Sequence, residues 1–164
     1  MKQQKTFSSF EICKGLEINR PTLQDWLSRG FVKPAIEAKG RGTKNVFSID
    51  NLYQIELFRQ LVARGFNRME CSQWIQYLSL EGIREFHMHP EMYSKAFPNI
   101  DFYKQDEFSH TPFLMITRRG SEYNRSLTSF NQLMEDRGED LKGVDEIHLI
   151  NLNSVIEKVE KAFF

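Results

Sequence analysis

The first eighty residues contain four stretches in which apolar side chains recur every three or four positions, the spacing of one face of an α-helix. Residues that favour helix N-termini precede all four stretches: Ser8 or Ser9, Asn19, Ser48 and Asn67. Gly30 follows the second stretch and can adopt the left-handed conformation that ends many helices. The pattern predicts helices over about residues 7–16, 20–29, 49–64 and 67–82.

The segment between the second and third predicted helices has a different pattern. Residues 31–34 and 46–47 have the character of short extended segments, and Lys39-Gly-Arg-Gly-Thr-Lys44 separates them. Two glycines and three basic side chains in six residues suit a flexible, positively charged turn. The sequence therefore predicts a β-hairpin with a basic tip.

The hydrophobic pattern weakens after Gly82, and residues 86–111 contain no sustained period from which an element can be placed. The remaining pattern predicts a small α/β domain over residues 83–164. Its predicted elements are strands at 112–117 and 146–152, a helix at 127–134, and a last helix that Asn153 or Ser154 caps and that contains Val155, Ile156 and Val159.

The formal charges cancel over the whole chain, with 22 Lys and Arg against 22 Asp and Glu, but they are unevenly distributed. Residues 1–80 carry 12 basic and 7 acidic side chains, which leaves +5, and residues 81–164 carry 10 and 15, which leaves −5. A basic half favours a polyanionic partner, whereas phosphate repels an acidic one. Charge alone leaves open that two ordinary domains simply differ in surface charge.

The chain lacks the features of a membrane or secreted protein. No run approaches the ~20 apolar residues that cross a bilayer, and no apolar segment of a signal peptide follows the basic N-terminus. Cys13 and Cys71 lie within helical apolar patterns without Cys-x-x-Cys spacing, which favours reduced, buried thiols. We therefore expect a soluble cytoplasmic protein with no membrane partner.

The predicted order of helix, short turn, helix, basic hairpin and two further helices is that of a winged helix-turn-helix. In such proteins the second helix enters the major groove with its first residues on base edges, and the hairpin contacts the backbone. Arg20 and Thr22 stand at the start of the second predicted helix, where the helix dipole also favours phosphate. Lys39, Arg41 and Lys44 are suited to phosphate contacts, which add affinity without reading sequence.

Several residues in this half have a recognisable spacing: Thr22-Leu23, Trp26, Gly30-Phe31, Pro34, Phe47–Leu52 and Arg64-Gly65-Phe66. Together with the hairpin, they resemble the amino-terminal domain of MerR-family transcription regulators over about residues 6–80. The resemblance implies a winged helix-turn-helix that recognises operator DNA, usually as a dimer. It assigns Arg20, Thr22 and Gln24 to the recognition helix, and Arg41 and Lys44 to the wing.

The chain departs from that family at two places. Gln24 and Asp25 stand where the family commonly has Arg and Tyr, and an acidic side chain near phosphates is unfavourable unless it points away or forms an ion pair. The family also continues into a long helix that pairs with its twin, which one glycine and three prolines after residue 80 prevent here. A homodimer therefore stays one of three open roles for residues 83–164, beside sensing an unknown small-molecule effector and binding a partner.

Other chemistry is not favoured by the sequence. His87 and His89 invite a metal hypothesis, but a spacing of two puts both on one side only in a strand, and no cysteine or carboxylate cluster completes the site. No phosphate-binding loop, nucleophile elbow or carboxylate pair is present. We expect no metal, no cofactor and no enzymatic activity.

The sequence thus predicts a mainly α protein, with a winged helix-turn-helix over residues 6–80 followed by a small α/β domain over residues 83–164. The expected function is sequence-specific binding of duplex DNA by a transcription regulator. One alternative is a protein-interaction adaptor that keeps the winged fold and has lost DNA binding. Another is a phage-excisionase-like architectural protein, which normally has little beyond the winged module. The predicted DNA-binding residues are Arg20, Thr22, Gln24, Lys39, Arg41 and Lys44.

Overall fold

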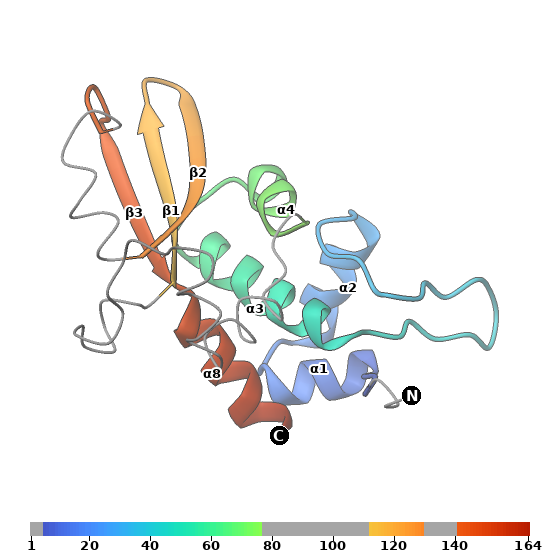
Figure 1. Ribbon diagram of the computed structural model, residues 1–164. Helices are drawn as coiled ribbons and strands as arrows, with labels where there is room; N and C mark the ends of the chain where they lie inside the picture. The colour runs from blue at the N-terminus through green and yellow to red at the C-terminus, as the bar shows by residue number, and fades with distance from the viewer. Residues whose placement is uncertain (1–4, 77–111, 130–140) are drawn as a thin grey trace. The chain divides into compact units, whose positions relative to one another are not determined.

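The computed structural model describes residues 5–76, 112–129 and 141–164 (Figure 1). These residues form five α-helices and a three-stranded sheet. The chain divides into two compact units, one made of residues 1–81 together with 155–164, the other of residues 82–154. The sequence prediction placed residues 83–164 in one domain, whereas the structure groups the last ten residues with the first unit.

Two short helices, α1 (Ser9–Gly15) and α2 (Arg20–Ser28), begin the first unit. Ser8 caps α1 in a capping box with Glu11: the Ser8 amide donates to the Glu11 carboxylate at 2.7 Å, and the Glu11 amide donates to the Ser8 hydroxyl at 3.3 Å. The hydrogen bond from the Ser8 backbone lowers the pKa of Glu11. Asn19 caps α2 by accepting from an amide of its first turn at 2.8 Å. Both predicted helices are confirmed.

The longest described helix, α3 (Ile49–Ala63), forms the centre of the first unit, and α4 (Arg68–Gln76) follows it. Ser48 caps α3, as the sequence predicts. The end of the fourth predicted helix near Gly82 lies outside the described residues. Five apolar side chains of α3 are at most 1% exposed: Leu52, Ile55, Leu57, Phe58 and Leu61.

An aromatic cluster holds α2 against α3. The rings of Trp26 and Phe58 meet edge to face with their centroids 5.0 Å apart, and Phe31 stacks on Phe58 at 5.8 Å. Burial of such large rings is a major stabilising contribution in a small core. The orientation of α2 therefore depends on Phe58. The prediction that Leu23, Trp26, Phe58 and Trp74 are core residues is confirmed, since each is at most 5% exposed.

The basic loop, residues 31–47, projects away from the helices between α2 and α3 (Figure 1). One antiparallel bridge joins its two limbs, with the Ile36 amide 3.0 Å from the Val46 carbonyl and the Val46 amide 2.9 Å from the Ile36 carbonyl. The predicted hairpin is only partly formed, because these residues contain isolated bridges and no strand. Pro34 in the first limb has no amide proton to donate, and Gly40 and Gly42 between the limbs do not favour strand pairing.

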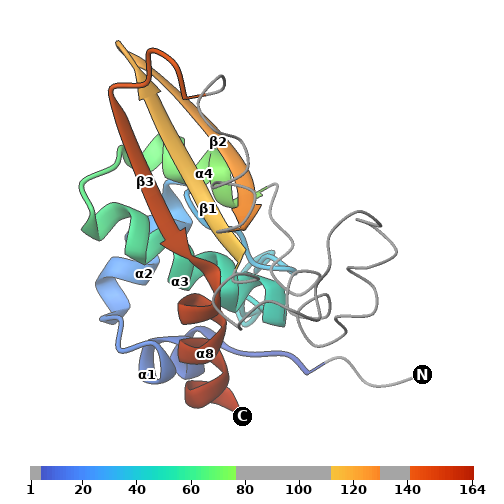
Figure 2. The same ribbon diagram turned by 60° about the vertical axis from the view of Figure 1, so that its left-hand side comes forward.

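The described part of the second unit is an antiparallel sheet in the order β2-β1-β3 (Figure 2). A tight turn at Gly120, whose φ is +59°, joins β1 (Pro112–Arg119) to β2 (Glu122–Ser129). The third strand, β3 (Glu146–Asn151), pairs with the other edge of β1. Both predicted strands are confirmed.

The helix predicted over residues 127–134 is wrong at its start. Residues 127–129 are the end of β2, where Leu127 pairs with Leu114 of β1. A short apolar run fits either period, and the hairpin with β1 decides in favour of the strand. Residues 130–134 and 86–111 lie outside the described part of the chain.

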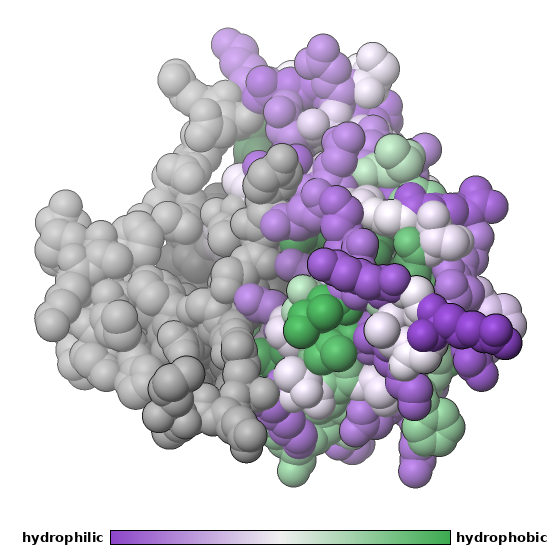
Figure 3. Space-filling model, turned by 90° about the vertical axis from the view of Figure 1, so that its right-hand side faces the viewer, coloured by the Kyte–Doolittle hydropathy of each residue, from purple (hydrophilic) through white to green (hydrophobic). Residues whose placement is uncertain are grey.

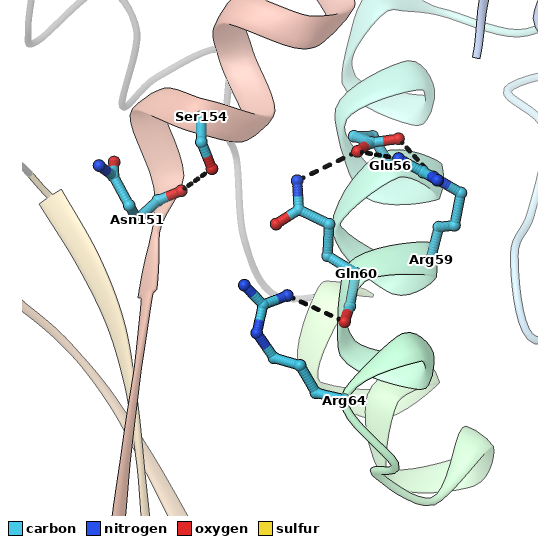
Figure 4. A network of polar contacts seen from close by, with 6 residues as sticks. All are labelled: Glu56, Arg59, Gln60, Arg64, Asn151 and Ser154. Carbon is cyan, nitrogen blue, oxygen red and sulfur yellow. Dashed lines mark hydrogen bonds and ion pairs between the residues drawn. The ribbon is translucent and has the colours of Figure 1, made fainter. Parts of the chain in front are cut away.

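The last helix, α8 (Leu152–Phe163), follows β3 without an intervening residue. The Ser154 hydroxyl donates to the Asn151 carbonyl at 2.7 Å (Figure 4). The Asn153 amide also donates to the Asn151 side chain, at 2.9 Å. The prediction that Asn153 or Ser154 is the cap is therefore wrong, because the helix starts as soon as strand pairing ends. The predicted apolar face is buried: Val155 and Val159 are 0% exposed and Ile156 is 7% exposed.

Candidate nucleic-acid interface

The start of α2 presents two of the predicted DNA-binding residues on one exposed face. Arg20 and Gln24 are one helical turn apart and both exposed, while Leu23 and Trp26 face the core. Thr22 lies on the flank of the helix and is half-buried. The first turn contains no acidic residue, so nothing there offsets the positive end of the helix dipole. The arrangement can present a cation and an amide to a polyanion.

The tip of the basic loop carries the other predicted residues, Lys39, Arg41 and Lys44, all of which are exposed. The intervening Gly40 and Gly42 have φ of +143° and +92°, which side chains with a Cβ rarely adopt. The Thr43 hydroxyl donates to the Gly40 carbonyl at 2.8 Å and closes the turn. Within the described residues, none of the three cations forms an ion pair with an acidic side chain.

Asp25, the acidic departure noted in the sequence, is held in two ion pairs. Its carboxylate lies 2.6 Å from Nε of Arg29 and 3.7 Å from a guanidinium nitrogen of Arg68. The Arg29 pair has the i, i+4 spacing that sequence reasoning could have identified. Arg68 was missed because it starts α4, and only the folding of α4 beside α2 brings it near. Two guanidinium groups thus compensate the negative charge of Asp25.

The face toward which the basic loop projects is mainly hydrophilic (Figure 3). Purple residues prevail over its described part, with smaller green areas between them. Two of the exposed large apolar side chains of the first unit are Ile36, on the loop, and Phe10, on α1, at 59% and 76% exposure. Single exposed apolar side chains are common on protein surfaces and define no site by themselves.

A buried charge supports α3 from within. Glu56 is 0% exposed, and its two carboxylate oxygens accept hydrogen bonds from Arg59 at 2.8 and 2.7 Å and from Gln60 at 3.0 Å (Figure 4). The hydrogen bond to Glu56 raises the pKa of Arg59. Every contact in this network comes from α3 itself. A buried carboxylate needs such partners, so we interpret the network as structural.

Two further observations concern the described residues. Within them, no group of three or more His, Cys, Asp or Glu side chains could hold a metal ion. The metal hypothesis concerned His87 and His89, which lie outside the described part. No described helix has the length and hydropathy that a membrane-spanning segment needs.

The two thiols are expected to differ in reactivity. Iodoacetamide should alkylate Cys13, which is half-exposed, in the native protein and reach Cys71, which is buried, only after unfolding. Burial raises the pKa of Cys71 to about 12, and the thiolate is the reactive form, so both access and ionisation protect it. Mass spectrometry of peptides from native and urea-unfolded samples measures this difference. Equal labelling in the native state would contradict the packing of α4.

The arrangement of α1, α2 and the helices that support them is that of a helix-turn-helix domain. Residues 7–78 match the family model of the MerR HTH family regulatory protein. The amino-terminal part of the chain is therefore a MerR-type helix-turn-helix domain, the kind found in DNA-binding transcription regulators. The match covers 72 of 164 residues, from 7 to 78, and includes all four helices from α1 to α4. A comparison with curated proteins found no match to the chain.

Proposed function

We propose that this chain is a sequence-specific transcription regulator that places the start of α2 in the major groove and the basic loop, as a wing, on the DNA backbone. One observation carries the proposal. A MerR-type domain presents four cations, Arg20, Lys39, Arg41 and Lys44, that are exposed and without an acidic partner among the described residues. Unpaired cations are available to neutralise phosphate and release its counterions.

The recognition helix supplies the base contacts in this proposal. An arginine at the start of such a helix can bind guanine through two hydrogen bonds, and a glutamine can do the same with adenine. Arg20 and Gln24 share the exposed face from which such contacts are made. Thr22 lies to the side and suits a sugar or phosphate contact.

The ion pairs of Asp25 support DNA binding over the adaptor alternative. That alternative was motivated by Gln24 and Asp25, because an uncompensated carboxylate would repel the backbone. With Arg29 and Arg68 beside it, the carboxylate adds no net negative charge to this part of the surface. An adaptor remains the interpretation to adopt if the protein binds no duplex at low salt.

The proposal leaves residues 82–154 as an effector-sensing, partner-binding or dimerising unit. A regulator of this kind acts in the cytoplasm on duplex DNA and needs no catalytic step. Selection of bound duplexes from a random pool tests the sequence specificity of binding and the homodimer in one experiment. An enriched palindrome would indicate a homodimer, and an enriched asymmetric site a monomer.

Two single substitutions separate base readout from backbone binding. Arg20→Ala is expected to cost about 1–3 kcal/mol on the selected duplex and much less on unrelated DNA, because it removes a base contact. Lys44→Ala should weaken binding to both duplexes alike and reduce the salt slope by about 1. Anisotropy titrations on both duplexes measure these effects. If Arg20→Ala weakens binding to both duplexes equally, α2 does not read bases.

A further inference from the structure

The C-terminal helix packs on the N-terminal helix of the MerR-type domain, although about seventy residues separate α8 from the matched segment. The two helices lie side by side in both ribbon views (Figures 1 and 2). The Phe163 ring meets the Phe7 ring edge to face with the centroids 5.2 Å apart. Lys5 donates to the Phe163 carbonyl at 2.8 Å, and its ammonium lies 4.3 Å from the Phe164 ring centroid.

Gly15, the last residue of α1, allows this close approach. A Cβ atom built on Gly15 would lie 2.5 Å from Cζ of Phe163 and 2.9 Å from two further ring atoms. Only glycine leaves room for the ring at this position without a shift. The contact lies immediately before the turn that leads into α2. It therefore involves the end of α1 that is joined to the start of the recognition helix.

The same aromatic contact also reaches the base of the loop. Phe7 is 4% exposed and pairs with Phe47 through two backbone hydrogen bonds of 2.9 Å. Phe47 directly follows Val46, which closes the basic loop, and directly precedes Ser48, the cap of α3. Phe163 therefore contacts α1 just before the turn that leads into α2, and its ring partner Phe7 is hydrogen-bonded to Phe47 at the base of the basic loop.

We propose that α8 is an integral helix of the DNA-binding unit, and that Phe163 is a positioning residue that holds the end of α1 and the base of the basic loop in their DNA-binding arrangement. The segment between α4 and α8 is then an insertion into that unit rather than a domain appended to it. The inference rests on the proposed function where duplex affinity is measured. The amide-exchange measurement of α8 packing does not depend on the proposed function.

The test is a double-mutant cycle in the full chain. Phe163→Ala should raise the exchange rates of the Phe7 and Phe47 amides about tenfold, the equivalent of one lost aromatic contact, and weaken duplex binding several-fold. Gly15→Ala should act in the same direction with a smaller effect, because the added methyl only displaces the end of the Phe163 ring. In the Phe163→Ala background, Gly15→Ala should have no further effect or a small favourable one, because alanine prefers helix more than glycine does. Phe10→Ala is the matched control, since that ring also lies on α1 and is 76% exposed.

Affinities are measured at a temperature where circular dichroism shows every variant folded, so that lost stability cannot mimic lost positioning. Weaker binding by folded Phe163→Ala protein supports positioning, and unchanged binding overturns it. Additive effects of the two substitutions would overturn the contact itself. If the wild-type chain binds no duplex while the exchange cycle behaves as expected, the proposed function fails and the packing of α8 stands.

Discussion

A variant with Lys39, Arg41 and Lys44 all changed to alanine is expected to bind its selected duplex roughly 500-fold more weakly at 0.1 M salt. Each neutralised phosphate contributes about 0.9 to the slope of log affinity against log salt concentration. At 0.1 M salt each contact therefore contributes about 0.9 of a decade of affinity, and three contacts contribute about 2.7 decades. The three side chains are exposed and form no ion pair with another described residue, which justifies counting each as a full contact.

Anisotropy titrations between 50 and 200 mM salt measure both the loss and the slope, which should fall by about 2.7. The matched control changes Arg119, Arg125 and Lys142 to alanine, which removes the same charge from exposed positions in the second unit. Its affinity should change far less. If the two triple variants lose affinity equally, the loop acts only through the net charge of the protein and is not a wing.

The replacement Phe58→Ala is expected to lower the free energy of unfolding by about 3–5 kcal/mol. The Phe58 ring is 0% exposed and touches both Trp26 and Phe31, so its loss leaves a cavity and breaks two aromatic contacts. A small domain is stable by only about 5–15 kcal/mol, so the variant should be near its unfolding threshold. DNA binding should fall with it, because Trp26 orients α2 through this ring.

Urea unfolding followed by tryptophan fluorescence and by circular dichroism measures the loss. Phe10→Ala makes the same chemical change at a side chain that is 76% exposed, and it should change stability by no more than about 0.5 kcal/mol. Should Phe58→Ala fail to fold at all, Phe58→Leu keeps most of the volume and should cost less than about 1.5 kcal/mol beyond the lost aromatic contacts. Equal stability of the Phe58 and Phe10 alanine variants would contradict the described core.

Most of the candidate site could be predicted from the sequence because its features are local. Arg20 and Gln24 follow an N-cap, Asn19, whose hydrogen bond to the first turn fixes where the helix begins and therefore which residues lead it. Gly40 and Gly42 mark the tip of the basic loop by their backbone freedom. Arg68 could not be predicted as a partner of Asp25, because the two belong to helices that meet only in the folded unit.

The outcome was different where an element depended on distant partners. The helix expected from Leu127 is the end of a strand, because residues 127–129 pair with β1, and the hydrophobic pattern of these residues does not indicate that pairing. The hairpin expected in the basic loop is reduced to one bridge, since pairing there has little support beyond its own limbs. A short apolar segment is compatible with the helix period and with the strand period, and only pairing with a neighbouring strand decides which structure forms.

The sequence by itself determined the four helices of the MerR-type domain, because hydrophobic period and capping residues act within a few positions of one another. It also determined which cations stand at the start of α2 and on the basic loop. Only the tertiary structure decided that α8 belongs with α1, since the space that Gly15 leaves is filled by Phe163 from the far end of the chain. Such contacts depend on the fit of surfaces brought together by folding, which one-dimensional spacing does not record.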